Sequence, residues 1–296
     1  MIIAVGSGKG GTGKTTVATS LALSLEAGDP GSAGWGEGPG RLLFLDCDVE
    51  VPNAALFLKP VLDESETVGL PIPEVDLGAC TFCGRCAEVC VWHAITVVGE
   101  RVLVFPELCH GCGSCTLNCP EAAIREVDNV IGKVESGRAG RIVFGQGILD
   151  VGQPMAVPVI RRLKEKHLGG LTDGVAVLDA PSGTSCPFVE TLRGVDYVLL
   201  VTEPTPFGLH DLRLAVEVAR DELALPVGVV VNRDGVGNAA VDDYCRGEGI
   251  PVLLRIPLDR RIAEGLSEGH PLVGVLPEYI ALFRGLLRRI SAEVAR

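Results

Sequence analysis

The stretch Gly8–Thr15, GKGGTGKT, decides the fold of this chain. It has the spacing G-x4-G-K-T of a phosphate-binding loop, in which backbone N–H groups and the start of a helix surround phosphate groups. The apolar run Ile2–Val5 precedes it and predicts a buried strand, and Thr15–Leu25 follows with the apolar spacing of a helix. The alternative is a glycine-rich turn without a ligand, but the strand–loop–helix context favours the phosphate loop.

Each position of this loop has an expected role in nucleotide binding. Glycines allow unusual backbone angles and let phosphates approach the chain closely. Lys14 is expected to contact the β- and γ-phosphates, and the Thr15 hydroxyl is expected to bind Mg²⁺. The predicted ATP-binding residues of the loop are Gly8, Lys9, Gly10, Gly11, Thr12, Gly13, Lys14, Thr15 and Thr16.

Further along the chain, short apolar strands alternate with helical stretches. The predicted strands are Arg41–Leu45, Val175–Leu178, Tyr197–Val201, Val227–Val231 and Val252–Ile256. Such alternation predicts an α/β fold with a mostly parallel, doubly wound sheet covered by helices on both faces. Gly28–Gly40 is rich in Gly, Pro and Ser and predicts an exposed connection, whereas the glycines of Gly137–Gly152 fit a hairpin or an extended arm.

Eight of the eleven cysteines fall in two runs with the same spacing, C-x2-C-x2-C-x3-C. This is the spacing of bacterial ferredoxins, in which the fourth cysteine of each run binds the cluster of the other run. Paired C-x2-C motifs also bind zinc, which is the alternative. We expect two 4Fe–4S clusters, one held by Cys80, Cys83, Cys86 and Cys119, and the other by Cys90, Cys109, Cys112 and Cys115.

The cysteine runs interrupt the α/β pattern, because strands of one sheet are predicted both before and after them. The sequence therefore predicts an inserted ferredoxin-like α+β domain with two 4Fe–4S clusters at residues 73–127. A P-loop ATPase domain is predicted for residues 1–72 and 128–296. The two runs also form an internal repeat, which is typical of a pseudo-symmetric unit.

The composition restricts the expected location and partners. A net charge of −12 over 296 residues argues against a broad nucleic-acid surface, which needs clustered Lys and Arg. The chain enters its first predicted strand at once, without a leader-like segment, and has no apolar run long enough to cross a bilayer. We therefore expect a cytoplasmic protein whose cysteines bind metal rather than form disulfides.

The sequence Lys9–Thr15, KGGTGKT, resembles the deviant Walker A motif of the MinD, ParA, Mrp and nitrogenase iron protein class of ATPases. The resemblance implies a dimer in which Lys9 reaches the nucleotide of the partner subunit, and it makes Lys9, Lys14 and Asp48 the expected catalytic residues. Asp48 would orient the attacking water, while Asp46, Asp179 and Thr15 would surround Mg²⁺. The alternatives are a solvated lysine at position 9 and acids that only cap strand ends.

The same class implies roles for residues nearer the C-terminus. Asn232 and Arg233 resemble its adenine-recognition site. Pro257 belongs to Ile256–Val273, which resembles the segment that covers the base. The final predicted helix, Tyr279–Val294, has an apolar face that favours packing on the core over binding to a membrane.

Cys186 follows Asp179 by seven residues. At this spacing the nitrogenase iron protein has a cysteine that binds a cluster between its subunits, so the resemblance makes Cys186 a possible metal ligand at a dimer interface. The alternative is an ordinary buried cysteine. Cys47 and Cys245 are expected to be structural.

The order of these motifs and the place of the insertion resemble one subgroup, the MinD-superfamily P-loop ATPases that contain an inserted ferredoxin domain. The resemblance covers nearly the whole chain, including Asp46–Asn53, Ser182–Leu192 and Val201–Leu212. It implies ATP hydrolysis linked to iron–sulfur chemistry, with ATP, Mg²⁺ and two 4Fe–4S clusters as cofactors. It also implies a homodimer or a heterodimer with a related ATPase.

Three functions fit these expectations. The first is an ATPase whose nucleotide-dependent dimerisation controls electron transfer through the two clusters to a redox partner protein. The second is an assembly or carrier ATPase for metal clusters, similar to Mrp-type scaffolds. The third is a positioning ATPase of the MinD or ParA kind with a redox sensor. The acidic charge disfavours nucleic acid as a partner, and binding to a membrane is not expected.

Overall fold

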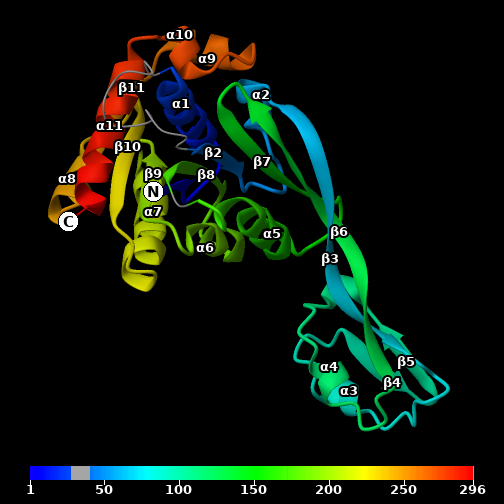
Figure 1. Ribbon diagram of the computed structural model, residues 1–296. Helices are drawn as coiled ribbons and strands as arrows, with labels where there is room; N and C mark the ends of the chain where they lie inside the picture. Colours follow the sequence, from blue (N-terminus) through cyan, green and yellow to red (C-terminus); the bar gives the residue numbers. More distant parts are fainter. Residues whose placement is uncertain (28–40, 172, 296) are drawn as a thin grey trace.

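The strands expected from the sequence form one large sheet (Figure 1). The computed structural model describes residues 1–27, 41–171 and 173–295, so the predicted connection Gly28–Gly40 lies outside the described residues. In this part of the chain the sheet has nine strands in the order β11-β10-β9-β1-β8-β2-β7-β6-β3. Their bounds are β1 Ile2–Ser7, β2 Arg41–Asp46, β3 Val61–Val75, β6 Ile124–Ala139, β7 Ile142–Leu149, β8 Gly174–Ser182, β9 Tyr197–Thr202, β10 Val227–Asp234 and β11 Val252–Pro257. All strands from β11 to β7 are parallel, which confirms the mostly parallel α/β sheet.

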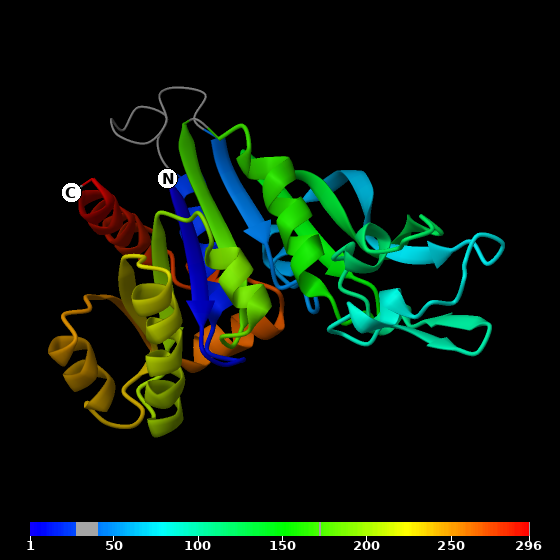
Figure 2. The same ribbon diagram turned by 90° about the horizontal axis from the view of Figure 1, so that it is seen from below.

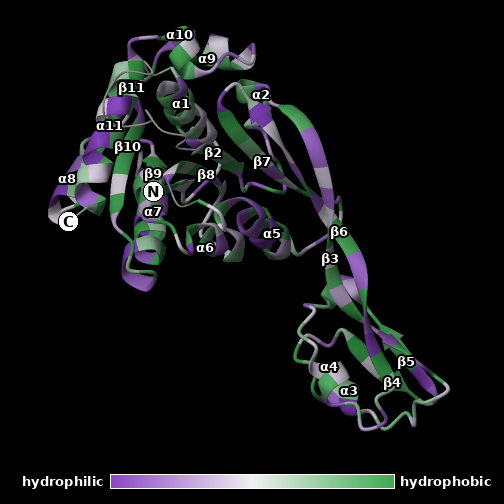
Figure 3. Ribbon diagram, in the orientation of Figure 1, coloured by the Kyte–Doolittle hydropathy of each residue, from purple (hydrophilic) through white to green (hydrophobic). Residues whose placement is uncertain are grey.

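Helices cover both faces of this sheet (Figure 2). One face is covered by α5 Ala156–Leu168, α6 Cys186–Leu192, α7 Pro206–Val216 with the π-helical turn Glu217–Glu222, and α8 Ala240–Gly247. The other face is covered by α1 Lys14–Glu26, α2 Ala55–Leu58, α9 Arg260–Ser267, α10 Leu272–Val275 and α11 Tyr279–Val294. Because the central strands are buried on both sides, they are apolar along nearly their whole length (Figure 3).

The last helix, α11, belongs to the core. Phe283, Leu287 and Ile290 on its apolar face are buried against the sheet layer that also contains Phe44. On its other side, Arg284 Nε donates to the carbonyl oxygen of Ser24 in α1 at 2.8 Å. The apolar face of α11 is therefore already covered by the protein itself.

The strands β3 and β6 form an antiparallel ribbon that leaves the sheet (Figure 1). Gly132–Ala139 of β6 also pairs with β7, so the glycine-rich stretch before Gly152 is a hairpin. Between Ile124 and Val130, β6 pairs with β3 alone. One extra residue, Ile131, stands in β6 where the ribbon leaves the sheet, and such a bulge bends a strand and increases its twist. Both domain boundaries expected from the sequence, at 72/73 and 127/128, fall inside this continuous ribbon.

The far end of the ribbon carries a small unit, residues 76–123, which we call the cysteine lobe (Figures 1 and 2). It contains α3 Arg85–Glu88, β4 Ile95–Val98, β5 Arg101–Val104, the 3-10 turn Pro106–Leu108 and α4 Ser114–Leu117. Its buried apolar cluster is small and is centred on Ile95 and on Ile124 at the end of the ribbon. The lobe is therefore separated from the hydrophobic core of the sheet domain.

Candidate functional site

The phosphate loop joins β1 to α1 and is held by close contacts on two sides. At Gly8 a Cβ would lie 2.0 Å from the carbonyl oxygen of Asp211 in α7. Gly13 has a φ of 96°, and a Cβ there would lie 2.4 Å from Asn232 Nδ2, so both positions require glycine. Among the residues that the structure describes, no side chain caps the start of α1 at Lys14, and the first turn of this helix has no acidic residue. The first N–H groups of α1 are thus suited to binding an anion.

A cavity of about 590 Å³ opens beside this loop, a size typical of small-molecule sites. Its walls come from the phosphate loop, the loop after β2, the end of β8, the start of α6, the end of β10 and the segment from Pro257 into α9. The predicted residues that line it are Gly11, Gly13, Lys14, Thr15, Thr16, Asp48, Asn232, Arg233 and Pro257. The predicted residues that do not line it are Gly8, Lys9, Gly10, Thr12, Asp46 and Asp179.

Asp179 is a buried carboxyl group behind the phosphate side of the cavity. It pairs in register with Val5 of β1 and with Asp46 of β2, so the two acids lie on neighbouring strands. Its side chain is 0% exposed, and neither carboxyl oxygen has a hydrogen-bond partner among the described residues. Burial, and then the nearby charge of Asp46, raise the pKa of Asp179 well above its ordinary value.

Asp46, the neighbouring buried acid, is bound to the loop after β2. Its Oδ1 accepts the N–H of Asp48 at 3.2 Å, and its Oδ2 accepts the N–H groups of Asn53 and Ala54, both at 2.9 Å. Burial raises the pKa of Asp46 to about 6, although these three N–H groups favour the charged form and lower it. The carboxyl group therefore anchors the loop after β2.

Asp48 lies on that anchored loop and lines the cavity. Burial raises the pKa of its carboxyl group, and the charge of Lys14 acts in the opposite direction. Lys14 is only 7% exposed, and its Nζ donates to the hydroxyl of Ser182 at 3.3 Å. The phosphate loop, the loop after β2 and the loop after β8 thus meet at one end of the cavity.

The opposite end of the cavity is less polar. Asn232 Nδ2 donates to the carbonyl oxygen of Thr12 at 2.7 Å, which ties the end of β10 to the phosphate loop. Ile262 and Leu266 of α9 line this end together with Pro257. The segment Ile256–Val273 was predicted to cover the base. The individual side chains of Ile262, Leu266 and Ser182 could not be predicted, because only the folded chain brings them to the cavity.

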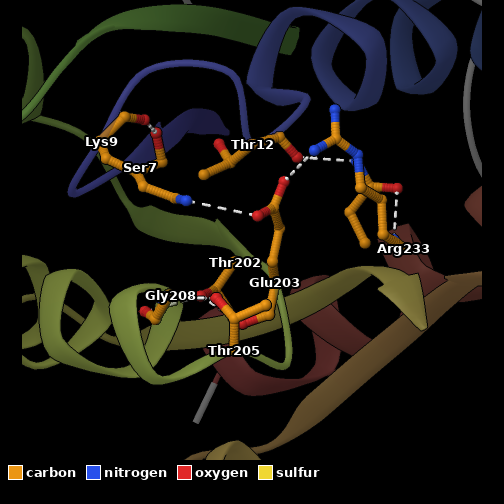
Figure 4. Close-up of polar contacts among 9 residues, drawn as sticks. Ser7, Lys9, Thr12, Thr202, Glu203, Thr205, Gly208 and Arg233 are labelled. Carbon is orange, nitrogen blue, oxygen red and sulfur yellow. Dashed lines mark hydrogen bonds and ion pairs between the residues drawn. The ribbon is translucent and has the colours of Figure 1, made fainter. Parts of the chain in front are cut away.

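Lys9 does not line the cavity, and its side chain points toward Glu203 (Figure 4). Its Nζ lies 3.3 Å from Glu203 Oε2, and its side chain is 31% exposed. This partner could not be predicted from the sequence, because it lies 194 positions away in the chain.

The eight cysteines of the two runs line two separate cavities in the cysteine lobe. One cavity is lined by Cys80, Cys83, Cys86 and Cys119, and the other by Cys90, Cys109, Cys112 and Cys115. In each set, three cysteines come from one run and the fourth comes from the other. Within the described residues, no three His, Cys, Asp or Glu side chains converge as around a single metal ion; the thiols of each set surround a cavity instead.

A repeat of 29 residues relates the two cavities. Phe82 and Gly111 both have positive φ and donate their N–H groups to the sulfurs of Cys80 and Cys109, at 3.4 and 3.5 Å. The same relation holds for Ala94 and Ala123, whose N–H groups donate to Cys90 and Cys119 at 3.3 Å. The helices α3 and α4 begin at Arg85 and Ser114, again 29 residues apart. The chain therefore folds twice into the same loop around a set of thiols.

The remaining cysteines have other surroundings. Cys186 is exposed at the first position of α6, and its neighbours Ser185 and Pro187 line the nucleotide-loop cavity. Cys47 and Cys245 are buried. Burial raises the pKa of the Cys245 thiol to about 11 and that of the Cys47 thiol still further, so both are expected to stay protonated.

The contrast between the two buried acids gives a testable expectation. Asp179→Asn should raise the free energy of unfolding of the nucleotide-free protein by about 1 kcal/mol, because it removes an unpaired buried acid next to Asp46. Asp46→Asn should lower it by about 2 kcal/mol or more, because an amide NH₂ would face backbone N–H groups. Urea unfolding at neutral pH without Mg²⁺ measures both changes. A less stable Asp179→Asn protein would show that Asp179 has a partner that stabilises it.

The sheet, the phosphate loop and the cavity define a nucleotide-binding α/β protein. Residues 3–272 match the family model described as CobQ/CobB/MinD/ParA nucleotide binding domain. The chain belongs to this family of nucleotide-binding domains.

Several proteins of Methanocaldococcus jannaschii are similar in sequence. One uncharacterized protein is 28% identical over 279 residues, which cover 91% of this chain and 90% of the relative. Another uncharacterized protein is 31% identical over 243 residues, which cover 80% of each chain. An iron-sulfur cluster carrier protein is 26% identical over 134 residues, which cover 40% of this chain and 46% of the relative.

Solved structures confirm the fold. The cell division ATPase MinD of Pyrococcus furiosus has a TM-score of 0.54 at 23% identity and covers 98% of each chain. The septum site-determining protein MinD of Pyrococcus horikoshii, complexed with Mg-ADP, has a TM-score of 0.56 at 21% identity and covers 98% of this chain and 95% of that one. The MinC:MinD cell division protein complex of Aquifex aeolicus has a TM-score of 0.57 at 15% identity, with 98% and 96% covered. Among the described residues, no helix is both long and apolar enough to span a membrane.

Proposed function

We propose that this protein is a dimeric ATPase whose cysteine lobe holds two 4Fe–4S clusters and passes electrons to a partner protein in one nucleotide state. The observation that carries the proposal is the position of α5. This helix contacts α6 at the nucleotide cavity and also β3, the strand that leads to the cysteine lobe. The helix α5 therefore connects the nucleotide site to the strand that leads to the cysteine lobe.

The nucleotide half of the proposal assigns a task to each group at the cavity. The start of α1 and Lys14 would hold the phosphates, and the Thr15 hydroxyl would bind Mg²⁺. The buried oxygens of Asp179, which have no hydrogen-bond partner among the described residues, would face Mg²⁺ and its bound water. The MinD structure of Pyrococcus horikoshii, which was solved as a complex with Mg-ADP, supports this proposal. Asn232, Arg233 and Pro257 would surround the base.

Hydrolysis would use Asp48 and a lysine from a second subunit. Asp48 lines the cavity on a loop that Asp46 holds in place, so it is suited to orienting a water molecule next to the last phosphate. Lys9 is partly exposed and outside its own cavity. We therefore propose that it acts on the nucleotide of the partner subunit, where its charge would stabilise the transition state.

The iron–sulfur half rests on the two cysteine cavities. Cys80, Cys83, Cys86 and Cys119 would hold one cluster, and Cys90, Cys109, Cys112 and Cys115 the other. The paired N–H donors to sulfur support thiolate charge in both loops, and hydrogen bonds of this kind tune reduction potentials. The clusters, when bound, supply one-electron transfer. On this proposal, the ferredoxin-like insertion consists of the cysteine lobe and its ribbon.

The contacts of α5 explain how the two halves would communicate. On one side, Lys164 Nζ donates to the carbonyl oxygens of Glu190, Thr191 and Arg193 at the end of α6, at 2.6, 3.1 and 2.7 Å. On the other side, Arg162 Nε donates to Glu66 of β3 at 2.8 Å. A shift of α6 on nucleotide binding would therefore move α5 and, through it, the base of the ribbon.

A second basic residue of α5, Lys166, also contacts the acids of β3. Its Nζ lies 3.0 Å from Glu64 and 3.8 Å from Glu66 of β3. Ion pairs this exposed are individually weak, so we expect them to set the position of α5 on β3 rather than the stability of the fold.

Anaerobically purified protein tests the proposal. It should contain about eight iron atoms per chain, and the rate at which an added acceptor oxidises its reduced clusters should differ between the ATP and ADP states. Lys14→Ala should remove this difference by removing nucleotide binding. The double variant Arg162→Gln, Lys166→Gln should remove the difference while ATP turnover and iron content stay within about twofold. If the protein has its full iron content but its reduced clusters are oxidised at the same rate with ATP as with ADP, the proposed coupling is wrong.

A second function is favoured by one observation, the partial match to an iron-sulfur cluster carrier protein. On this alternative the lobe would give up its clusters to other proteins instead of keeping them. Cys83 and Cys112, one in each set, are exposed and accessible to an acceptor. Loss of iron to an apo-ferredoxin on ATP addition would favour this carrier function over electron transfer.

A further inference from the structure

Glu203 lies between two cations, Lys9 of the phosphate loop and Arg233 of β10 (Figure 4). Its side chain directly follows β9 and is 9% exposed. Oε2 accepts from Lys9 Nζ at 3.3 Å, and Oε1 accepts from Arg233 Nη1 at 2.7 Å. Lys9 belongs to the phosphate loop, whereas Arg233 lines the cavity next to Asn232. One buried carboxylate therefore links the residue proposed to act on a partner with the residue proposed to bind the base.

The backbone of Glu203 packs closely against the start of α7. Thr205 Oγ1 caps α7 by accepting the N–H of Gly208 at 3.0 Å, and Thr202 Oγ1 donates to the carbonyl oxygen of Gly208 at 2.9 Å. A Cβ at Gly208 would lie 2.2 Å from the carbonyl oxygen of Glu203, so the chain is closely packed there. A shift of the Glu203 backbone would therefore also move the start of α7.

The bond to Arg233 is the shorter of the two, at 2.7 Å against 3.3 Å for Lys9. Arg233 lies in β10 with a left-handed φ of 53°, and its N–H donates to Asn232 Oδ1 at 2.9 Å. Both cationic side chains are partly exposed, 31% for Lys9 and 53% for Arg233. If Lys9 leaves, Glu203 keeps the bond to Arg233 and does not become an unpaired buried charge, which would be strongly unfavourable.

We propose that Glu203 is a positioning residue that holds the Lys9 ammonium on its own subunit until a partner subunit offers a nucleotide phosphate in exchange. The inference rests on the proposed function, in which Lys9 acts across the dimer. No covalent bond changes in this exchange, since one ion pair replaces another. The strength of the pair between Glu203 and Lys9 therefore sets how readily the nucleotide-bound dimer forms.

The test uses the full chain with Mg²⁺ and adenylyl imidodiphosphate, an ATP analogue that resists hydrolysis. Glu203→Gln keeps an oxygen for Arg233 but loses the charge that attracts Lys9. We expect the dimer dissociation constant, measured by analytical ultracentrifugation, to fall about fivefold for each lysine released. With ATP, the kcat of the saturated dimer should stay unchanged, while half-maximal activity should be reached at lower protein concentration.

Lys9→Gln provides the matched background. It should weaken the dimer, and adding Glu203→Gln to it should then have no further effect, because the lysine is already absent. If Glu203→Gln leaves the dissociation constant unchanged or raises it, while Lys9→Gln weakens the dimer, the positioning role is overturned and the proposed function stands. If Lys9→Gln itself leaves the dimer and the turnover unchanged, the proposed action of Lys9 across the dimer is overturned instead.

Discussion

Cys119→Ala is expected to remove about half of the iron of the anaerobically purified protein. Cys119 belongs to the second cysteine run, but it lines the same cavity as Cys80, Cys83 and Cys86 of the first run. The cluster lost should therefore be the one bound by the first run. ATP turnover is expected to remain measurable, because the cysteine lobe lies beyond a ribbon and is not part of the hydrophobic core of the sheet domain.

Double variants decide whether the runs exchange their fourth cysteines. Cys80→Ala with Cys119→Ala should keep about half of the iron, since both residues line one cavity, whereas Cys80→Ala with Cys90→Ala should lose nearly all of it. Iron and sulfide analysis, together with electron paramagnetic resonance of the reduced protein, measures both. The opposite pattern would show that each run binds its own cluster. Cys47→Ala, at a buried position in the sheet domain, is the control and should keep all the iron.

Asp48→Ala is expected to lower kcat for ATP hydrolysis by about 10²–10⁴-fold, the usual contribution of a group that activates or orients water. Nucleotide affinity should change only a few-fold, because the phosphate loop and the base side of the cavity stay intact. Asp48 lines the cavity, where burial raises the pKa of its carboxyl group and the charge of Lys14 lowers it. The carboxylate therefore lies at the end of the cavity where Lys14 would hold the phosphates. Steady-state hydrolysis and equilibrium binding of a fluorescent ATP analogue measure the two quantities separately.

Glu50→Ala is the matched control for Asp48→Ala. Glu50 is an exposed acid on the same loop and lines the same cavity. It should leave kcat within about twofold, as expected for an exposed surface position. If both variants lost activity to the same degree, the negative charge of the loop would matter rather than the position of Asp48.

The sequence predicted the parts of this protein whose signals are local. The phosphate loop, the parallel strands and the two thiol sets depend on short spacings that one stretch of chain contains. The pairing of Cys90 with Cys109, Cys112 and Cys115 could be expected because the spacing itself implies an exchange between repeats.

Contacts between distant elements could not be predicted in this way. The use of Asp46 as an anchor for three N–H groups depends on the path of the loop after β2. Glu203 and the residues of β3 that bind α5 are ordinary acids in the sequence, and only the fold places them beside Lys9 and Arg162. The ribbon was also missed, because β3 reads as a polar segment with two prolines.

The bulge at Ile131 is a point at which the ribbon could rotate and so move the cysteine lobe. Beyond it, Gly69–Val75 and Ile124–Val130 extend the ribbon as a free two-stranded arm. At a rise of about 3.3 Å per residue the arm is about 23 Å long, so a rotation of about 10° at the bulge would swing its tip by about 4 Å. A small adjustment at the base would thus decide whether the tip of the arm can touch another molecule. The length of the arm, more than any single contact, would then determine how far a change at the nucleotide site is amplified.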